Sequence, residues 1–263
     1  MTADHVRAAG LRLRVARLGA GRPLLLVTGI GANLDMWEPF RRLVSGRELV
    51  AFDLPGSGGS QRPRRPLRMG SLAAVVVALL DELGLDEVDV LGYSFGGGLA
   101  QELARRAPQR VRRLVLCATG PGLGGVPPWP YPALLLASPA RYHHPSAFRF
   151  EVPRIAGGRT RREPELLAHQ AAARLGRPPD PLGYAFQLYA VAGWTSLPWL
   201  HRLRQRTLVV AGDQDPIVPV ANAKLLARRI PDARLRLVTG GGHLFLLDEP
   251  GTVAADIKRF LDA

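Results

Sequence analysis

The stretch G-Y-S-F-G at 92–96 constrains the fold of this chain more than any other feature of the sequence. It directly follows the short apolar run Val88–Leu91 and precedes a helical pattern over Gly97–Ala107. Between a strand and a helix, a G-x-S-x-G motif is typical of a tight, strained turn that presents the serine hydroxyl. Side chains at Gly92 or Gly96 would collide with neighbouring backbone in such a turn. The context therefore predicts a nucleophilic serine rather than one that only caps a helix.

Short apolar runs alternate with helical patterns in the first third of the chain and again near its end. This alternation is typical of βαβ units and predicts an α/β fold with a mostly parallel, doubly wound sheet. We expect strands at Val6–Ala9, Leu11–Ala16, Leu24–Val27, Leu49–Phe52, Val88–Leu91, Val111–Cys117, Thr207–Ala211 and Leu235–Val238. We expect helices at Leu34–Leu43, Leu72–Leu83, Gly97–Ala107, Val220–Arg229 and Thr252–Leu261.

The alternation stops between residues 123 and 205. This segment is rich in proline, aromatic residues and short helical patches, and it shows no strand rhythm. The pattern predicts a helical cap over residues 123–205, inserted into an α/β core of residues 1–122 and 206–263.

A nucleophilic serine needs a base, and the base needs a carboxylate that orients it. In a sheet with this order of elements, the acid and the histidine follow late strands. The loop A-G-D-Q-D-P supplies Asp213 and Asp215, and the glycine-rich loop G-G-G-H supplies His243. We expect Ser94, Asp215 and His243 to form a catalytic triad, with Asp213 supporting its loop.

An ester carbonyl under attack also needs two backbone N–H donors that hold the developing oxyanion. One should be the N–H of Phe95, which follows the nucleophile. The other should come from the loop T-G-I-G-A-N, most directly from Ile30, with Gly29 and Gly31 letting the backbone turn inward.

Apolar side chains near these groups are candidates for an acyl pocket. Gly29, beside the expected oxyanion donor, and Leu244, beside the expected base, are expected to contact substrate. The aromatic candidates in the cap are Trp129, Tyr131, Phe186, Tyr189 and Trp194. Each of these aromatic side chains could instead pack only within the cap.

Composition narrows the class of protein. Of 35 basic residues only Lys224 and Lys258 are lysines, and the arginines are spread along the chain, so the net charge of +13 does not indicate a nucleic-acid surface. A single cysteine, Cys117, excludes an intrachain disulfide and a multi-cysteine metal site. No apolar run is long enough for a membrane span, and the charged N-terminal stretch lacks a signal-peptide core, which predicts a cytoplasmic protein.

The sequence resembles the α/β-hydrolase superfamily from about Leu24 to Leu261. Within it, the stretches A-S-P-A-R-Y, A-G-W-T-S-L-P-W-L and G-G-G-H-L-F-L-L-D-E-P resemble the intracellular poly(3-hydroxyalkanoate) depolymerases that act on medium-chain polyesters. The resemblance implies a carboxylic-ester hydrolase that uses Ser94, Asp215 and His243 without a cofactor or metal. Its partner would be an apolar ester or polyester, including the surface of a polyester granule.

Other substrates suit the same triad. A small-molecule esterase, a thioesterase and a C–C bond hydrolase all pass through a similar oxyanion, so the triad residues do not separate them. A non-catalytic binding protein on this fold is a further alternative. The sequence gives no indication of the oligomeric state.

Overall fold

The computed structural model describes residues 2–163, 165–248 and 250–263. In this part of the chain, eight strands form one sheet in the order β1-β2-β4-β3-β5-β6-β7-β8. Strands β3 to β8 are parallel where they pair, and β2 is antiparallel to both β1 and β4. The mostly parallel α/β sheet predicted from the sequence is therefore confirmed. The strands are β1 (Asp4–Ala8), β2 (Leu11–Leu18), β3 (Arg22–Val27), β4 (Arg47–Phe52), β5 (Val88–Tyr93), β6 (Val111–Cys117), β7 (Arg206–Gly212) and β8 (Ala233–Val238).

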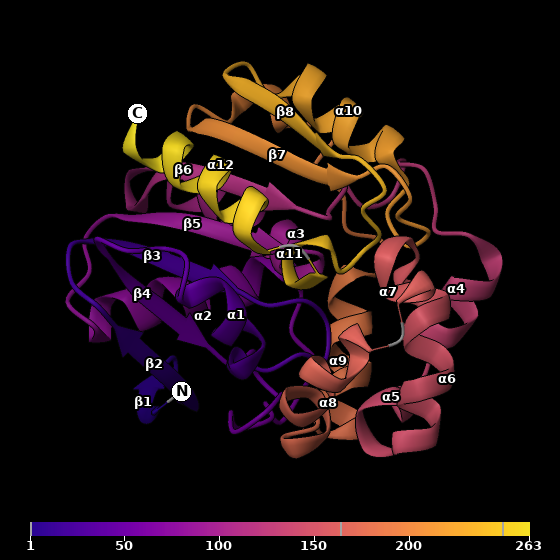
Figure 1. Ribbon diagram of the computed structural model, residues 1–263. Coiled ribbons are helices and arrows are strands. Elements are labelled where there is room, and N and C mark those ends of the chain that lie inside the picture. Colours follow the sequence, from indigo (N-terminus) through magenta and orange to yellow (C-terminus); the bar gives the residue numbers. More distant parts are fainter. Residues whose placement is uncertain (1, 164, 249) are drawn as a thin grey trace.

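The sheet is buried on both faces, as its continuous apolar runs predict. Successive side chains of a strand point to opposite faces, so Leu25 and Val27 belong to one core while Leu24 and Leu26 belong to the other. Residues of α2 (Met69–Glu82), α3 (Phe95–Arg106) and α10 (Val220–Arg229) fill the first core. Residues of α1 (Glu38–Arg41), α11 (Phe245–Asp248) and α12 (Pro250–Asp262) fill the second, and Figure 1 shows α12 crossing the near face of the sheet.

A helical insertion separates β6 from β7, as the sequence predicts. It lies beyond the arrowheads of the parallel strands, on the right of Figure 1, where the loops after the strands also gather. Its helices are α4 (Pro130–Leu136), α5 (Ala140–His143), α6 (Pro145–Ala156), α7 (Gly158–Arg162), α8 (Leu166–Gly176), α9 (Pro181–Val191) and the 3₁₀ turn η3 (Leu200–Arg202). The division into a core of 1–122 and 206–263 and a cap of 123–205 stays a prediction.

One predicted helix differs in type and length from the prediction. The pattern over Leu34–Leu43 forms a 3₁₀ turn, η1 (Leu34–Trp37), followed by the four-residue α1. Pro39 lies at the start of α1, and proline has no N–H to continue a helical hydrogen-bond ladder from the preceding turn. No helix in the described ranges is long and apolar enough to cross a membrane.

Candidate active site

Ser94 occupies the turn between β5 and α3 in a strained backbone conformation, with φ 55° and ψ −118°. The backbone N–H of Ser94 donates to Cys117 O at 2.9 Å, which fixes the turn against the next strand. A Cβ built on Gly92 would lie 2.4 Å from Gly96 O, and one built on Gly96 would lie 2.2 Å from Val27 O. The steric prediction for both glycines is confirmed, and it explains why the turn needs glycine at positions 92 and 96.

The structure brings Ser94, His243 and Asp215 together from three different loops. His243 Nε2 lies 3.0 Å from Ser94 Oγ, and His243 Nδ1 lies 2.7 Å from Asp215 Oδ2. The other carboxylate oxygen of Asp215 accepts hydrogen bonds from the N–H groups of Ile217 and Val218 at 2.8 and 2.9 Å. With His243 and Asp215 both buried, this order of contacts orients the imidazole so that Nε2 faces the serine hydroxyl.

Asp213 lies in the same loop but faces away from this group. Its carboxylate accepts a hydrogen bond from Gly240 N at 2.7 Å on the exposed side of the loop. The structure therefore gives Asp213 a contact that joins the loops after β7 and β8, and it leaves Asp215 as the carboxylate beside His243.

The loop after β3 is held against the serine by two residues of the helical insertion, which the sequence analysis did not identify. Tyr142 donates to Ile30 O at 2.7 Å, and Gly31 N donates to the buried Gln187 Oε1 at 2.9 Å. Gly31 has φ +68°, and a Cβ there would lie 2.8 Å from the Tyr142 ring, so this position requires glycine. Phe95 begins α3, where the first N–H groups have no partner inside the helix.

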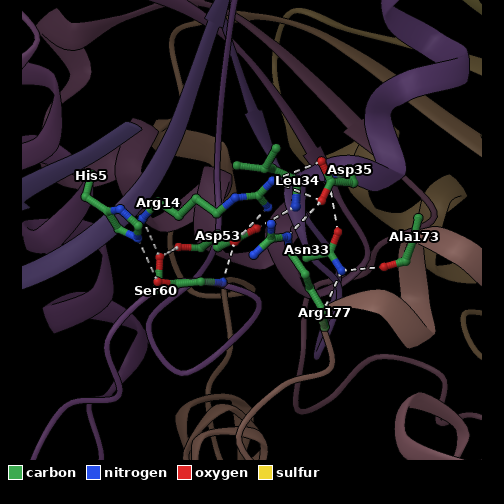
Figure 2. Close-up of polar contacts among 10 residues, drawn as sticks. His5, Arg14, Asn33, Leu34, Asp35, Asp53, Ser60, Ala173 and Arg177 are labelled. Atoms are coloured by element: carbon green, nitrogen blue, oxygen red, sulfur yellow. Dashed lines mark hydrogen bonds and ion pairs between the residues drawn. The ribbon is translucent and has the colours of Figure 1, made fainter. Parts of the chain in front are cut away.

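A buried cluster of charged residues lies at the end of the same loop (Figure 2). Arg14 binds Asp53 at 3.2 Å and Asp35 at 3.0 Å, while Asp53 also accepts hydrogen bonds from Leu34 N at 2.6 Å and Gly59 N at 2.8 Å. Burial raises the pKa of Asp53 above its usual range, although Arg14 and these N–H groups oppose the shift. The cluster fixes the start of η1 a few residues after Ile30.

A cavity of about 440 Å³ opens at Ser94. Its walls come from α2, the start of α3, the segment after β6, α9 and the loop after β7. Most of the lining is apolar, which suits the hydrocarbon part of a ligand. The large apolar side chains in its walls are Met69, Leu136, Leu188, Val191, Trp194 and Ile217.

A narrower pocket of about 70 Å³ also reaches Ser94. His243 lines this pocket and does not line the larger cavity. Gly29 and Leu244 line it as well, so both predicted contact residues lie beside the expected nucleophile and base.

Among the predicted cap aromatics, only Trp194 lines either cavity. Trp129 is wrong as a pocket residue, because its side chain is 60% exposed and lies outside both cavities. The backbone N–H of Trp129 bonds to Pro216 O, and α4 follows with Tyr131 also exposed. Phe186 and Tyr189 instead lie against the guanidinium groups of Arg62 and Arg68.

Other reactive side chains offer no second centre in the described residues. Cys117 is buried in β6, and this burial raises the pKa of its thiol far above the usual range. No three His, Cys, Asp or Glu side chains within the described ranges lie together as a possible metal site.

The chain is similar to known hydrolases over most of its length. A family model described as the alpha/beta hydrolase fold matches residues 22–250. The chain is 46% identical over 241 residues, covering 91% of this chain and 84% of the relative, to a poly(3-hydroxyalkanoate) depolymerase of Ectopseudomonas oleovorans. It is 34% identical over 249 residues, covering 89% of this chain and 96% of the relative, to a pimeloyl-[acyl-carrier protein] methyl ester esterase of Aromatoleum aromaticum.

Solved structures show the same architecture. A hydrolase from Pseudomonas aeruginosa PA01 is 26% identical and superposes with a TM-score of 0.85 over 99% of this chain and 98% of that one. A thermophilic esterase from Thermogutta terrifontis is 26% identical, with a TM-score of 0.82 over 100% of this chain and 98% of that one. The resemblance found in the sequence is confirmed by these matches.

Proposed function

The chain belongs to the α/β-hydrolase family, and on that premise we propose that it is a serine hydrolase of 3-hydroxyalkanoate polyesters or their oligomers. The observation that carries the proposal is the continuous contact from Ser94 through His243 to Asp215, with bonds of 3.0 and 2.7 Å, at the meeting point of two cavities. A base within hydrogen-bond reach of a serine, itself oriented by a carboxylate, is the arrangement that acyl transfer needs.

The reaction follows from this geometry. His243 Nε2 takes the hydroxyl proton as Ser94 Oγ attacks the ester carbonyl, and the N–H groups of Phe95 and Ile30 hold the oxyanion. His243 then gives the proton to the leaving alcohol oxygen, and the C–O bond breaks. Water attacks the acyl-enzyme as His243 takes its proton, which releases the acid and restores Ser94. Asp215 stays ionised and stabilises the imidazolium at both stages.

The substrate class rests on similarity and on shape. The relative at 46% identity is a poly(3-hydroxyalkanoate) depolymerase, and the match extends through most of this chain. The larger cavity offers apolar walls for an alkyl side chain, and a triad of this kind cleaves esters without a cofactor.

A polyester surface is the proposed partner because exposed apolar side chains lie at the larger cavity and in the segment that follows it in the chain. Leu123 and Val126 are exposed and line that cavity, and exposed Trp129, Tyr131 and Leu134 follow directly in the chain. Exposed apolar side chains that gather in one segment suit contact with an apolar solid. The proposal places the protein in the cytoplasm on intracellular granules, where a lone unpaired cysteine is usual.

Hydrolysis of amorphous medium-chain polyester, beside soluble esters, tests the proposal. We expect mass spectrometry to detect 3-hydroxy acids released from the polymer by the wild type and none released by Ser94→Ala. Turnover confined to acetyl or butyryl p-nitrophenyl esters, or to acyl thioesters, with no acid released from the polymer, would contradict the substrate and leave the serine-hydrolase mechanism standing.

A further inference from the structure

Two buried arginines, Arg141 and Arg174, line the narrow pocket beside His243. Arg141 is 1% exposed and Arg174 is 8% exposed. Buried cations are unusual unless they are paired. Both come from the helical insertion, Arg141 from α5 and Arg174 from α8. The proposed polyester reaction uses neither Arg141 nor Arg174.

Arg141 has partners within the protein. Its guanidinium donates to Ser138 O at 2.7 Å and to Tyr184 Oη at 2.6 Å, and it also lies over the rings of Tyr142 and Tyr184. These contacts account for its burial, so Arg141 holds the insertion together and adds positive charge to the pocket.

Arg174 differs, because its Nε is fully buried and has no hydrogen-bond partner within the described residues. The described part of the chain also gives it no ion pair, and its contact with the Tyr142 ring, at 5.9 Å, is a weak one. The carboxylate of Asp248 acts on it only from a distance, since that carboxylate bonds to Thr160 at 2.6 Å and to Gln170 at 3.2 Å. A buried cationic donor without an acceptor, in a pocket that reaches the nucleophile, is suited to bind an anionic group of a ligand.

The end of α8, the helix that carries Arg174, is bonded to the loop that carries the expected oxyanion donor (Figure 2). Asn33 Nδ2 donates to Ala173 O at 2.6 Å and to Arg177 O at 2.9 Å, which flank Arg174 at the end of α8. Asn33 Oδ1 in turn accepts from Asp35 N at 3.0 Å. The last turn of α8, which carries Arg174, is thus attached to the loop after β3.

From these contacts we propose that Arg174 binds the carboxylate of a leaving 3-hydroxy acid, so that the enzyme cleaves the ester bond next to the free carboxyl end of an oligomer. The inference rests on the proposed polyester function. His243 must protonate the leaving oxygen, so the leaving group lies on the His243 side of Ser94, and His243 lines the pocket that contains Arg174. The polymer's remaining acyl chain then occupies the larger apolar cavity.

A pair of dimer substrates tests this assignment. One is 3-hydroxyoctanoyl-3-hydroxyoctanoate with its free carboxylate, and the other is the methyl ester of the same dimer. We expect the wild type to favour the free acid in kcat/KM by about 10- to 100-fold, the effect of a hydrogen bond to a charged group. Arg174→Met should bring the ratio of the two kcat/KM values close to one, and Arg174→Lys should restore part of it. Because each variant is judged by a ratio, a general loss of activity does not imitate the result.

Arg177→Met is the matched control, because Arg177 lies one turn away with an exposed side chain, 56% accessible, and should keep the wild-type ratio. If Arg174→Met does not fold, inhibition of the wild type can be measured with 3-hydroxyoctanoate and with its methyl ester. The ratio of the two inhibition constants supplies the same comparison. Equal wild-type rates on the two dimers would overturn the inference and leave the polyester function intact. Hydrolysis of neither dimer would overturn both.

The alternative ligand for Arg174 is a carboxylate on the acyl part of the substrate rather than on the leaving group. The mono-p-nitrophenyl ester of a seven-carbon diacid, compared with p-nitrophenyl heptanoate, presents that arrangement. An Arg174-dependent preference for the diacid ester, without one for the free dimer, would overturn the assignment to the leaving group. An Arg174-dependent preference confined to the dimer would support it.

Discussion

The phenol of Tyr93 donates a hydrogen bond to the backbone carbonyl oxygen of His243. The residue immediately before the nucleophile therefore anchors the loop that carries the base, across 150 residues of sequence. His243 N donates in turn to Ala156 O in the helical insertion, so both polar groups of the His243 backbone are used. Burial raises the pKa of Tyr93 well above its ordinary value, which keeps the phenol a donor at every pH of practical assay.

Tyr93→Phe should therefore lower kcat more than it changes KM. The variant leaves a buried carbonyl without its partner, which should reduce the free energy of unfolding by about 1–3 kcal/mol, and a looser His243 should lower kcat by about 10-fold. Steady-state kinetics and urea unfolding measure the two effects. Tyr189→Phe, at an exposed site outside both cavities, is the control. Reduced stability with wild-type kcat would show that the bond is structural only.

Ser94 should be the single site of covalent labelling by an organophosphonate. The strained turn presents its hydroxyl to His243, which activates it, and peptide mass spectrometry should find the adduct there. Ser94→Ala should keep the fold, lose the label and lower kcat by several orders of magnitude. Ser71→Ala, at an exposed serine of α2, should be labelled like the wild type. An adduct on any other residue of active protein would contradict the assignment of the nucleophile.

The two aspartates of the loop after β7 should differ sharply. Asp215→Asn should lower kcat by about 10⁴-fold, because an amide beside Nδ1 favours the wrong imidazole tautomer. Asp213→Asn should have a small effect, since the Asp213 carboxylate bonds to Gly240 N at the surface and not to His243. Circular dichroism establishes that each variant is folded before kinetics are compared. Greater loss in folded Asp213→Asn than in folded Asp215→Asn would assign the acid to Asp213.

Local sequence patterns predicted the strands of the sheet, and together with the strand order they selected the three residues that the structure brings together at Ser94. The run Val111–Cys117 forms β6 with the predicted bounds, because a fully buried parallel strand reads as a continuous apolar run. Ser94 is recognisable because its turn needs glycines at fixed spacing, and these constraints lie within five residues. Asp215 and His243 follow from the order of strands rather than from their neighbours.

The insertion was less predictable, because its contacts join residues far apart in the chain. Tyr142 bonds to Ile30 across 112 residues and Gln187 to Gly31 across 156, and neither pairing leaves a periodic pattern. Aromatic content did not reveal which side chains face inward, so Trp129 was assigned wrongly while Trp194 was assigned to the cavity it lines. Arg174 gave no signal, since a buried arginine looks like a surface arginine in a sequence.

Removing the cation of the buried cluster in Figure 2 should destabilise the protein in a pH-dependent way. Arg14→Met leaves Asp53 charged and unpaired, and should lower the free energy of unfolding by about 3–5 kcal/mol near pH 8. In the variant the pKa of Asp53 should rise further above that of the unfolded chain. As the pH falls, Asp53 of the native state therefore takes up a proton before Asp53 of the unfolded chain does. Stability relative to wild type should therefore partly recover by about pH 5.5.

Urea unfolding of both proteins at the two pH values measures this change. Arg17→Met removes a half-exposed arginine, 42% accessible, that pairs with Glu48, and should cost about 1 kcal/mol or less at either pH. A loss for Arg14→Met that is equal at both pH values would show that protonation of Asp53 does not relieve it.

The size of the larger cavity should set the preferred acyl length. Each methylene buried there is worth about 0.8 kcal/mol, so the four more carbons of hexanoyl over acetyl p-nitrophenyl esters should raise kcat/KM by about two orders of magnitude. Leu188 of α9 lines the cavity, and Leu188→Trp should fill part of it and move the optimum to shorter chains. Leu182→Trp, on the same helix but 49% exposed and outside both cavities, should keep the wild-type optimum. A series from two to twelve carbons measures all three proteins. An optimum at two carbons in the wild type, or an unchanged optimum in Leu188→Trp, would show that the acyl chain does not enter this cavity.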